Sequence, residues 1–110
     1  MERQIRSGRI HPGMTFNQKV WALCARIPAG KVCTYGDIAR ELGAPGAARA
    51  VGNALNKNPY SPQVPCHRVV GSTGALTGFA GGLPKKKTML QKEGVAVKDD
   101  RVSLIDKFNF

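Results

Sequence analysis

Hydrophobic positions recur at helical spacing in the stretch TFNQKVWALCARI, residues 15–27. In a helix these positions would lie on one face. The residues are Phe16, Val20, Leu23, Cys24 and Ile27. Thr15, with Gln18 three residues later, is typical of a capping box at the start of a helix. The pattern therefore predicts a first helix here, with Cys24 as a packed core thiol rather than a reactive one.

The next two segments predict helices joined by a tight turn. Thr34 and Asp37 form a second cap-like pair that opens YGDIARELG, and APG connects this segment to AARAVGNALNKN, residues 47–58. The last segment is rich in Ala and Gly, and its polar residues recur at i, i+4 and i+7 on one face: Arg49, Asn53 and Asn56. A capped helix, a short turn and a thin helix carrying an arginine indicate a helix-turn-helix. The small residues fit either close approach to a ligand or tight packing in the protein's own core.

The second half of the chain has a different pattern. Three prolines precede the short apolar piece HRVV, and the glycine-rich GSTGALTGFAGG then predicts a hairpin or wing with a mobile loop. LPKKKTMLQKEGV predicts a last helix that begins near Pro84, with a solvated start at residues 85–87. We expect a mostly α fold, a winged helix-turn-helix-like domain with a short hairpin. Residues 1–14 are expected to be a flexible basic arm, 15–97 the domain and 98–110 a C-terminal tail.

The net charge of the chain indicates what class of partner it binds. The chain has 110 residues, with 17 Lys and Arg against 7 Asp and Glu, giving a net charge of +10. Such a surplus favours a polyanionic partner, nucleic acid before others, although it also fits simple solubility. Neither a long apolar run nor a basic amphipathic stripe is present, so no membrane partner is expected. The N-terminal residues do not resemble a secretory signal, which favours an intracellular location, the cytoplasm and nucleoid or a eukaryotic nucleus.

The three cysteines do not indicate a disulfide framework or a metal site. Their number is odd and no CxxC is present. Cys66 and His67 are adjacent, a poor arrangement for two ligands of one tetrahedral zinc ion. We therefore expect reduced thiols and no bound metal.

Cys66 and its neighbours suggest nucleophilic chemistry. A thiolate attacks carbon far better than a thiol does, and His67 and Arg68 supply a candidate base and a positive charge. Adjacent residues on an extended segment point to opposite sides, so His67 is expected to act through a water or a folded-back turn. A third group must orient the imidazole, and both Glu93 and Asp37 are candidates. The alternative is a buried thiol beside an unrelated histidine.

Several motifs together resemble one known family. GKVCTYGDIA, AARAVGNAL, PCHRVVGSTGALTGFAGG and MLQKEG occur in this order between Thr15 and Val97. The chain is similar to the C-terminal, DNA-binding and active-site domain of the O6-alkylguanine-DNA alkyltransferases. The resemblance implies irreversible, single-turnover transfer of the alkyl group from guanine O6 to a cysteine, after the nucleotide is flipped out of the duplex.

The resemblance also implies site residues, a partner and the absence of a cofactor. Cys66 would accept the alkyl group, with His67 as a base acting through water, Glu93 as its orienting carboxylate and Asn58 bracing the turn. Arg49 would replace the extruded nucleotide and Tyr35 would crowd the phosphate, with further contacts to the minor groove of double-stranded DNA from Thr34, Ala48 and Asn53. The guanine pocket would be lined by Pro65, Val69, Gly78, Phe79 and Ala80.

Two departures from the family leave an alternative function open. Residues 1–14 are too few for the family's N-terminal domain, and Phe79 and Ala80 stand where members often have Tyr and Ser. The alkyltransferase-like proteins are single domains of this length that bind the same lesions and signal to nucleotide excision repair factors. They characteristically lack the cysteine, often having Trp there. Cys66, with its His, Asn and Glu partners, favours alkyl transfer.

Overall fold

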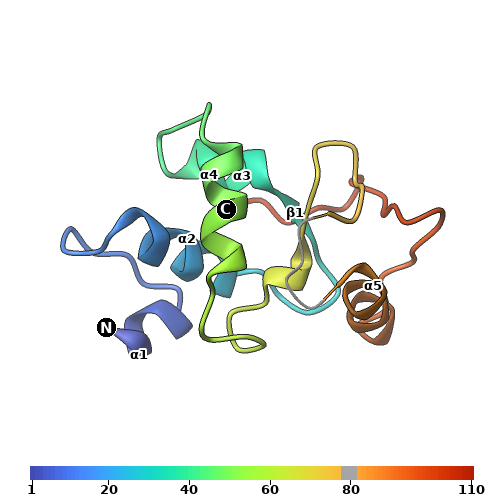
Figure 1. Ribbon diagram of the computed structural model, residues 1–110, viewed down its shortest axis with the longest axis horizontal. Coiled ribbons are helices and arrows are strands. Elements are labelled where there is room, and N and C mark those ends of the chain that lie inside the picture. The colour runs from blue at the N-terminus through green and yellow to red at the C-terminus, as the bar shows by residue number, and fades with distance from the viewer. Residues whose placement is uncertain (78–81) are drawn as a thin grey trace.

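The protein is described by a computed structural model that covers residues 1–77 and 82–110 (Figure 1). The α-helices of this part of the chain are α1 (Glu2–Arg6), α2 (Phe16–Ala25), α3 (Tyr35–Glu41), α4 (Ala48–Asn56) and α5 (Leu83–Lys92). A short 3₁₀ helix, η1 (Cys66–Arg68), precedes the second of two short strands, β1 (Cys33–Thr34) and β2 (Val69–Val70). The mainly helical fold expected from the sequence is confirmed. No helix within the described residues is long and apolar enough to cross a membrane.

Both predicted helix caps are present. The Thr15 hydroxyl accepts from the Gln18 backbone at 3.1 Å, and the Gln18 side chain accepts from the Thr15 backbone at 2.9 Å. At the start of α3, Thr34 and Asp37 make the same reciprocal pair, with Asp37 in the role of the usual Glu or Gln. Two local sequence signals therefore set where α2 and α3 begin.

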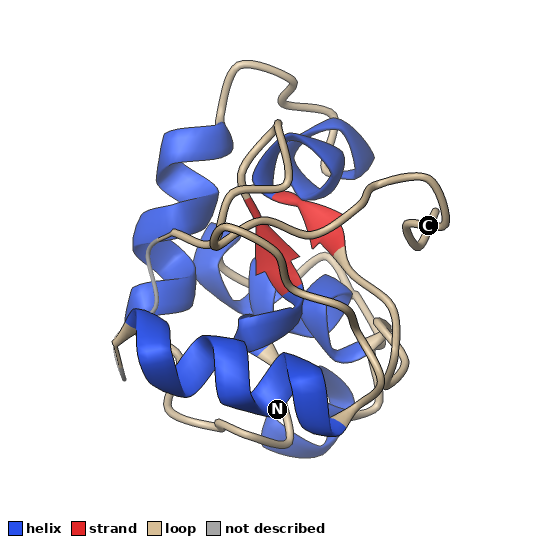
Figure 2. Cartoon of the chain, turned by 90° about the vertical axis from the view of Figure 1, so that its right-hand side faces the viewer, coloured by secondary structure: helices blue, strands red, loops and turns tan. Residues whose placement is uncertain are grey.

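The two short strands come from distant parts of the chain. β1 and β2 lie side by side (Figure 2) and pair in parallel, with Cys33 opposite Val69. In the chain, α3 and α4 lie between them. A parallel pair needs such a crossover, which a local turn signal does not reveal. The glycine-rich segment after β2 turns back on itself, with the Gly71 amide donating to the Ala75 carbonyl at 2.9 Å. It also pairs with the C-terminal tail, where the Val102 amide donates to the Gly74 carbonyl at 3.0 Å. Only glycine fits at position 74, because a Cβ there would lie 2.1 Å from the Val102 carbonyl oxygen.

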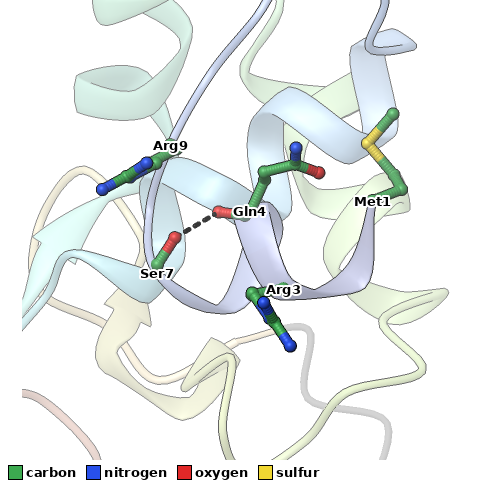
Figure 3. A pocket seen from close by; sticks show the side chains of 5 residues that line it. All are labelled: Met1, Arg3, Gln4, Ser7 and Arg9. Atoms are coloured by element: carbon green, nitrogen blue, oxygen red, sulfur yellow. Dashed lines mark hydrogen bonds between the residues drawn. The ribbon is translucent and has the colours of Figure 1, made fainter.

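The N-terminal residues, expected to be a flexible arm, begin with a packed helix in the structure. Ile5 of α1 is fully buried in the same cluster as the buried side of α2. Arg26, just after α2, donates from Nε to the Gly8 carbonyl at 2.8 Å and holds the end of α1. The outer side of α1 carries a hollow of about 500 Å³ (Figure 3), lined by Met1, Arg3, Gln4, Ser7 and Arg9.

Two hydrophobic clusters make up the core and meet at the segment η1–β2. The larger packs α1, α2, α3 and α4 around Val69, and the smaller packs α5 and the tail around Val70. Trp21 joins α2 to α4, since its Nε1 donates to the Ala54 carbonyl at 2.7 Å. Its ring also meets Tyr60 edge-on, with centroids 5.8 Å apart. Residues 66–70 thus lie where the helix-turn-helix side meets the α5 side.

Candidate active site and nucleic-acid interface

The turn before Cys66 is held by one asparagine. Asn58 donates from Nδ2 to the Val64 carbonyl at 2.8 Å, and its Oδ1 accepts from the Tyr60 amide at 2.8 Å. The Val64 carbonyl also accepts from the Cys66 amide at 2.9 Å, so the last turn before η1 is closed. Asn58 thereby sets where the η1 helix begins and where the Cys66 side chain is presented.

Cys66 differs from the other two cysteines in its exposure. It is partly exposed, whereas Cys24 and Cys33 are fully buried. Burial raises the pKa of both buried thiols well above the ordinary value. These two side chains therefore stay protonated and packed, as expected for Cys24, and Cys66 is the thiol that a substrate can reach.

His67 is oriented by Glu93 and not by Asp37. The 3₁₀ turn directs the His67 ring inward, where its Nε2 lies 3.1 Å from Oε2 of Glu93 at the end of α5. Asp37 instead caps α3 and pairs with Lys107 of the tail at 2.9 Å. The structure thus selects one of the two carboxylates that the sequence left open.

Arg68 holds the same carboxylate from its other side. Its Nε donates to Oε1 of Glu93 at 2.9 Å and its terminal nitrogen to Oε2 at 2.5 Å. The second terminal nitrogen donates to the Ile27 carbonyl at 2.6 Å. This bidentate pair fixes the carboxylate, and through it the plane of the His67 ring. The sequence indicated Arg68 only as a nearby positive charge, because the Glu93 contact joins residues 25 positions apart.

The network sets the charge of each member. Partial burial alone would raise the pKa of Glu93, but hydrogen bonds from Arg68 and His67 outweigh it and lower that pKa below its ordinary value. Burial lowers the pKa of His67, an effect that Glu93 opposes and that Arg68 and Lys86 add to. At neutral pH the pair is therefore a carboxylate beside a neutral imidazole.

The free nitrogen of His67 can accept a proton. With a carboxylate at Nε2, that nitrogen carries the hydrogen and Nδ1 has the lone pair. Nδ1 is buried and has no hydrogen-bond partner among the residues that the structure describes. A buried nitrogen in this state is suited to bind a water molecule or to take a proton from a nearby group.

Lys86 is a buried cation that the sequence analysis placed in solvent. It is fully buried in α5, and its Nζ donates to the carbonyls of Val69 at 2.6 Å and Thr77 at 2.7 Å. The expectation of a solvated lysine run is therefore wrong at this position. Helical spacing could have indicated it, because Lys86 is four residues before Leu90 and seven before Glu93, on the inward face of α5.

An open groove lies along α4 and the start of α3. Its volume is about 360 Å³, and its lining residues are Tyr35, Ala48, Arg49, Gly52, Asn53, Asn56 and Thr77. Four of the five residues expected to bind DNA thus share one surface. Thr34 does not, since it is buried and its hydroxyl caps α3. The small residues of α4 have two different surroundings, because Ala54 packs in the core while Ala48 and Gly52 line the groove.

The expected guanine pocket is described only on one side. Pro65 and Val69 are buried on either side of η1. Gly78, Phe79 and Ala80 lie outside the described residues, so their part in the pocket stays a prediction. Within residues 1–77 and 82–110, no group of His, Cys, Asp and Glu could hold a metal ion.

Curated relatives match the greater part of this chain. The methylated-DNA--protein-cysteine methyltransferase of Salmonella typhimurium is 52% identical over 82 residues, which are 74% of this chain and 48% of the relative. The protein of the same name from Mycobacterium leprae is 52% identical over 81 residues, 74% of this chain and 49% of the relative. The chain therefore spans about half the length of these relatives.

Solved structures share the fold. S. pombe Atl1, in a complex with damaged DNA containing O6-carboxymethylguanine, matches with a TM-score of 0.77 and 35% identity, over 86% of this chain and 95% of Atl1. Mycobacterium tuberculosis OGT, in a complex with DNA, matches with a TM-score of 0.70 and 42% identity, over 84% of this chain and 62% of OGT. These matches confirm the helix-turn-helix-like fold. Because residues 15–95 also match the family described as 6-O-methylguanine DNA methyltransferase, DNA binding domain, the chain belongs to that family.

Proposed function

We propose that this protein repairs DNA by direct reversal, moving the alkyl group from O6 of a guanine in duplex DNA to Sγ of Cys66. The observation that carries the proposal is an accessible Cys66 next to a buried His67, whose ring is oriented by the Glu93–Arg68 pair. A lesion-binding protein without chemistry has no need of a nucleophile or of a base held in one protonation state.

The bonds balance without a cofactor. The proton of the Cys66 thiol passes to Nδ1 of His67, through a water molecule, and Glu93 stabilises the imidazolium that results. The Sγ thiolate attacks the alkyl carbon, a thioether bond forms and the bond from carbon to guanine O6 breaks. The guanine anion then takes the proton back from His67, which leaves normal guanine and an alkylated Cys66. Because the thioether is stable, each molecule reacts once.

The groove along α4 is proposed as the protein surface that binds the minor groove of DNA. A stacked guanine hides its O6, so the nucleotide must leave the duplex at a cost of a few kcal/mol. Arg49 is exposed on α4 and can take the place of the extruded nucleotide. The small side chains of Ala48 and Gly52 let α4 approach the floor of the DNA minor groove. Tyr35 stands at the groove edge, where it can crowd the phosphate of the flipped nucleotide.

A second candidate is a non-catalytic lesion sensor that signals to nucleotide excision repair factors. One observation favours it: the structure matches Atl1 with a TM-score of 0.77, against 0.70 for OGT. Under this function Cys66 would be part of a binding pocket and would never gain a substituent. The two candidates therefore predict different masses for the Cys66 peptide after the protein has met the lesion.

The test is to incubate the intact protein with duplex DNA carrying O6-methylguanine and to measure peptide masses. We expect the Cys66 peptide to gain one CH₂, with at most one equivalent per chain. Cys66→Ser should bind the lesion duplex and gain no mass, because a hydroxyl is a far weaker nucleophile at neutral pH. Cys33→Ser is the matched control and should still accept the methyl group. Tight lesion binding by the intact protein without any gain of mass would overturn the proposal and favour the sensor.

A further inference from the structure

Trp21 contacts two parts of the proposed site at once. The side chain is half-buried on α2, and its Nε1 donates to the Ala54 carbonyl at 2.7 Å. That carbonyl belongs to the last turn of α4, where carbonyls are left without the usual i+4 amide and take other donors. The indole ring also meets the Tyr60 ring edge-on, with the centroids 5.8 Å apart. One side chain therefore joins the helix that lines the groove to the segment that leads to Cys66.

The segment between α4 and η1 connects Tyr60 to Cys66 by backbone hydrogen bonds. The Tyr60 amide donates to Oδ1 of Asn58 at 2.8 Å, and the Tyr60 carbonyl accepts from the Val64 amide at 2.9 Å. The Val64 carbonyl in turn accepts from Nδ2 of Asn58 and from the Cys66 amide. Tyr60 is thus part of the closed turn that presents the thiol, and its ring rests on Trp21.

Helix α2 supports both parts of the site. It lies beside α4 (Figure 1) and also packs against η1. Most of these contacts are apolar, and burial of apolar surface has no directional preference. The hydrogen bond from Trp21 to Ala54 is directional, so it fixes where the end of α4 lies along α2. The side chain therefore does more than fill space between the two helices.

Transfer from a duplex places a demand on this arrangement that a free base does not. A flipped nucleotide stays joined to a duplex that α4 holds, so its alkyl carbon reaches Sγ of Cys66 only when α4 and η1 are correctly placed. A misplacement of about 1 Å can cost about 10²-fold in rate. We propose that Trp21 is a positioning residue of the transfer reaction, which sets the register between α4 on the DNA and the turn that presents Cys66. The inference rests on the proposed function.

The experiment compares the intact protein with Trp21→Phe and Trp21→Tyr. Both variants keep an aromatic ring for Tyr60 and lack the indole N–H that binds Ala54. Phe16→Leu is the matched control, because Phe16 is an exposed aromatic residue at the start of the same helix. Urea unfolding followed by circular dichroism establishes that each variant is folded.

Three quantities are measured for each variant. The first is the single-turnover rate of methyl transfer at saturating O6-methylguanine duplex. The second is the rate of reaction with free O6-alkylguanine base. The third is the affinity for the lesion duplex, measured with Cys66→Ser added so that no transfer occurs. A protein that is merely destabilised would lose both rates together, whereas a lost register affects the duplex reaction alone.

We expect both Trp21 variants to transfer about tenfold more slowly from saturating duplex, with the affinity and the free-base rate changed by less than about twofold. Phe16→Leu should match the intact protein in all three quantities. Equal slowing on duplex and free base would overturn the inference, as would weaker binding without a slower saturated rate. So would Trp21 variants as fast as an active intact protein, and the proposed function would then still stand. An intact protein that never gains a methyl group from duplex would overturn the proposed function, and this inference with it.

Discussion

Helices α4 and α5 both carry basic residues, and the two use them in opposite ways. On α4, Arg49 is exposed and has no ion pair or side-chain hydrogen bond within the described residues. On α5, Lys86 is buried, and its Nζ donates to two backbone carbonyls. Glu93 at the end of the helix pairs with the largely buried Arg68. The same kind of charge is thus exposed to solvent on one helix and used inside the protein on the other.

The difference in burial leads to different physical behaviour. An exposed charge costs little to keep, and mobile salt ions screen its interactions. A buried charge costs desolvation free energy, is poorly screened by salt and shifts the pKa of its neighbours. Functions of the α4 side should therefore respond to salt, whereas functions of the α5 side should respond to pH.

The largest effect is expected from Glu93→Gln. The amide cannot hold Arg68 and His67 as an anion does, so the base loses both its orientation and its stabilised imidazolium. We expect methyl transfer to slow by about 10²–10³, measured in single-turnover reactions on O6-methylguanine duplex. The free energy of unfolding should fall by about 1–3 kcal/mol, because Arg68 loses its partner. Glu41→Gln, an exposed change of the same kind on α3, should alter neither quantity, and equal rates in the two variants would remove Glu93 from the site.

The next largest effect is expected from Arg49→Ala. Transfer from a lesion in duplex DNA should slow by about 10- to 100-fold, because nothing then fills the space of the extruded nucleotide. Reaction with a free O6-alkylguanine base should be unchanged, since no flipping is needed. Lys57→Ala removes an exposed charge just after α4 and is the matched control. Equal losses on duplex and free base would show that Arg49 acts on the chemistry and not on flipping.

Salt concentration should affect DNA binding at the α4 side but not the reactivity of Cys66, and by a smaller factor than the two substitutions above. Affinity for duplex DNA should fall at least tenfold between about 50 and 200 mM salt, because Lys and Arg contacts release counterions from the phosphates. Alkylation of Cys66 by iodoacetamide should change little over the same range, since the charges around it are buried. A binding titration that is flat in salt would mean that the α4 groove is not the DNA surface.

The smallest effect concerns stability and pH. The folded-state pKa of Lys86, about 8, lies below its ordinary value of 10.5, so the unfolded chain binds more protons between these values. Stability from this group therefore rises with pH in that window, by at most about 1.4 kcal/mol per pH unit. Urea unfolding of the protein and of Lys86→Met at pH 8 and pH 10 should show the difference changing in favour of the unmodified protein. An unchanged difference would mean that Lys86 keeps an ordinary pKa when folded.

Local patterns in the sequence determined the helices and the motifs. Thr15 with Gln18 and Thr34 with Asp37 start α2 and α3 as predicted, because a cap involves residues only three positions apart. The spacing of Arg49 and Asn53 on a thin helix likewise predicted the polar face that lines the groove. The family motifs are contiguous stretches, so they too could be recognised without a structure.

Tertiary structure decided which distant groups meet. Glu93 and not Asp37 orients His67, although both stand in suitable polar segments, because the end of α5 packs against η1. Lys86 is buried and not solvated because the carbonyls that bind it belong to Val69 of β2 and to Thr77. The parallel pairing of β1 with β2 joins strands separated by two helices. Each of these contacts depends on how whole elements pack. Helical spacing can place Lys86 on the inward face of α5, but neither periodicity nor capping signals show which distant groups it meets.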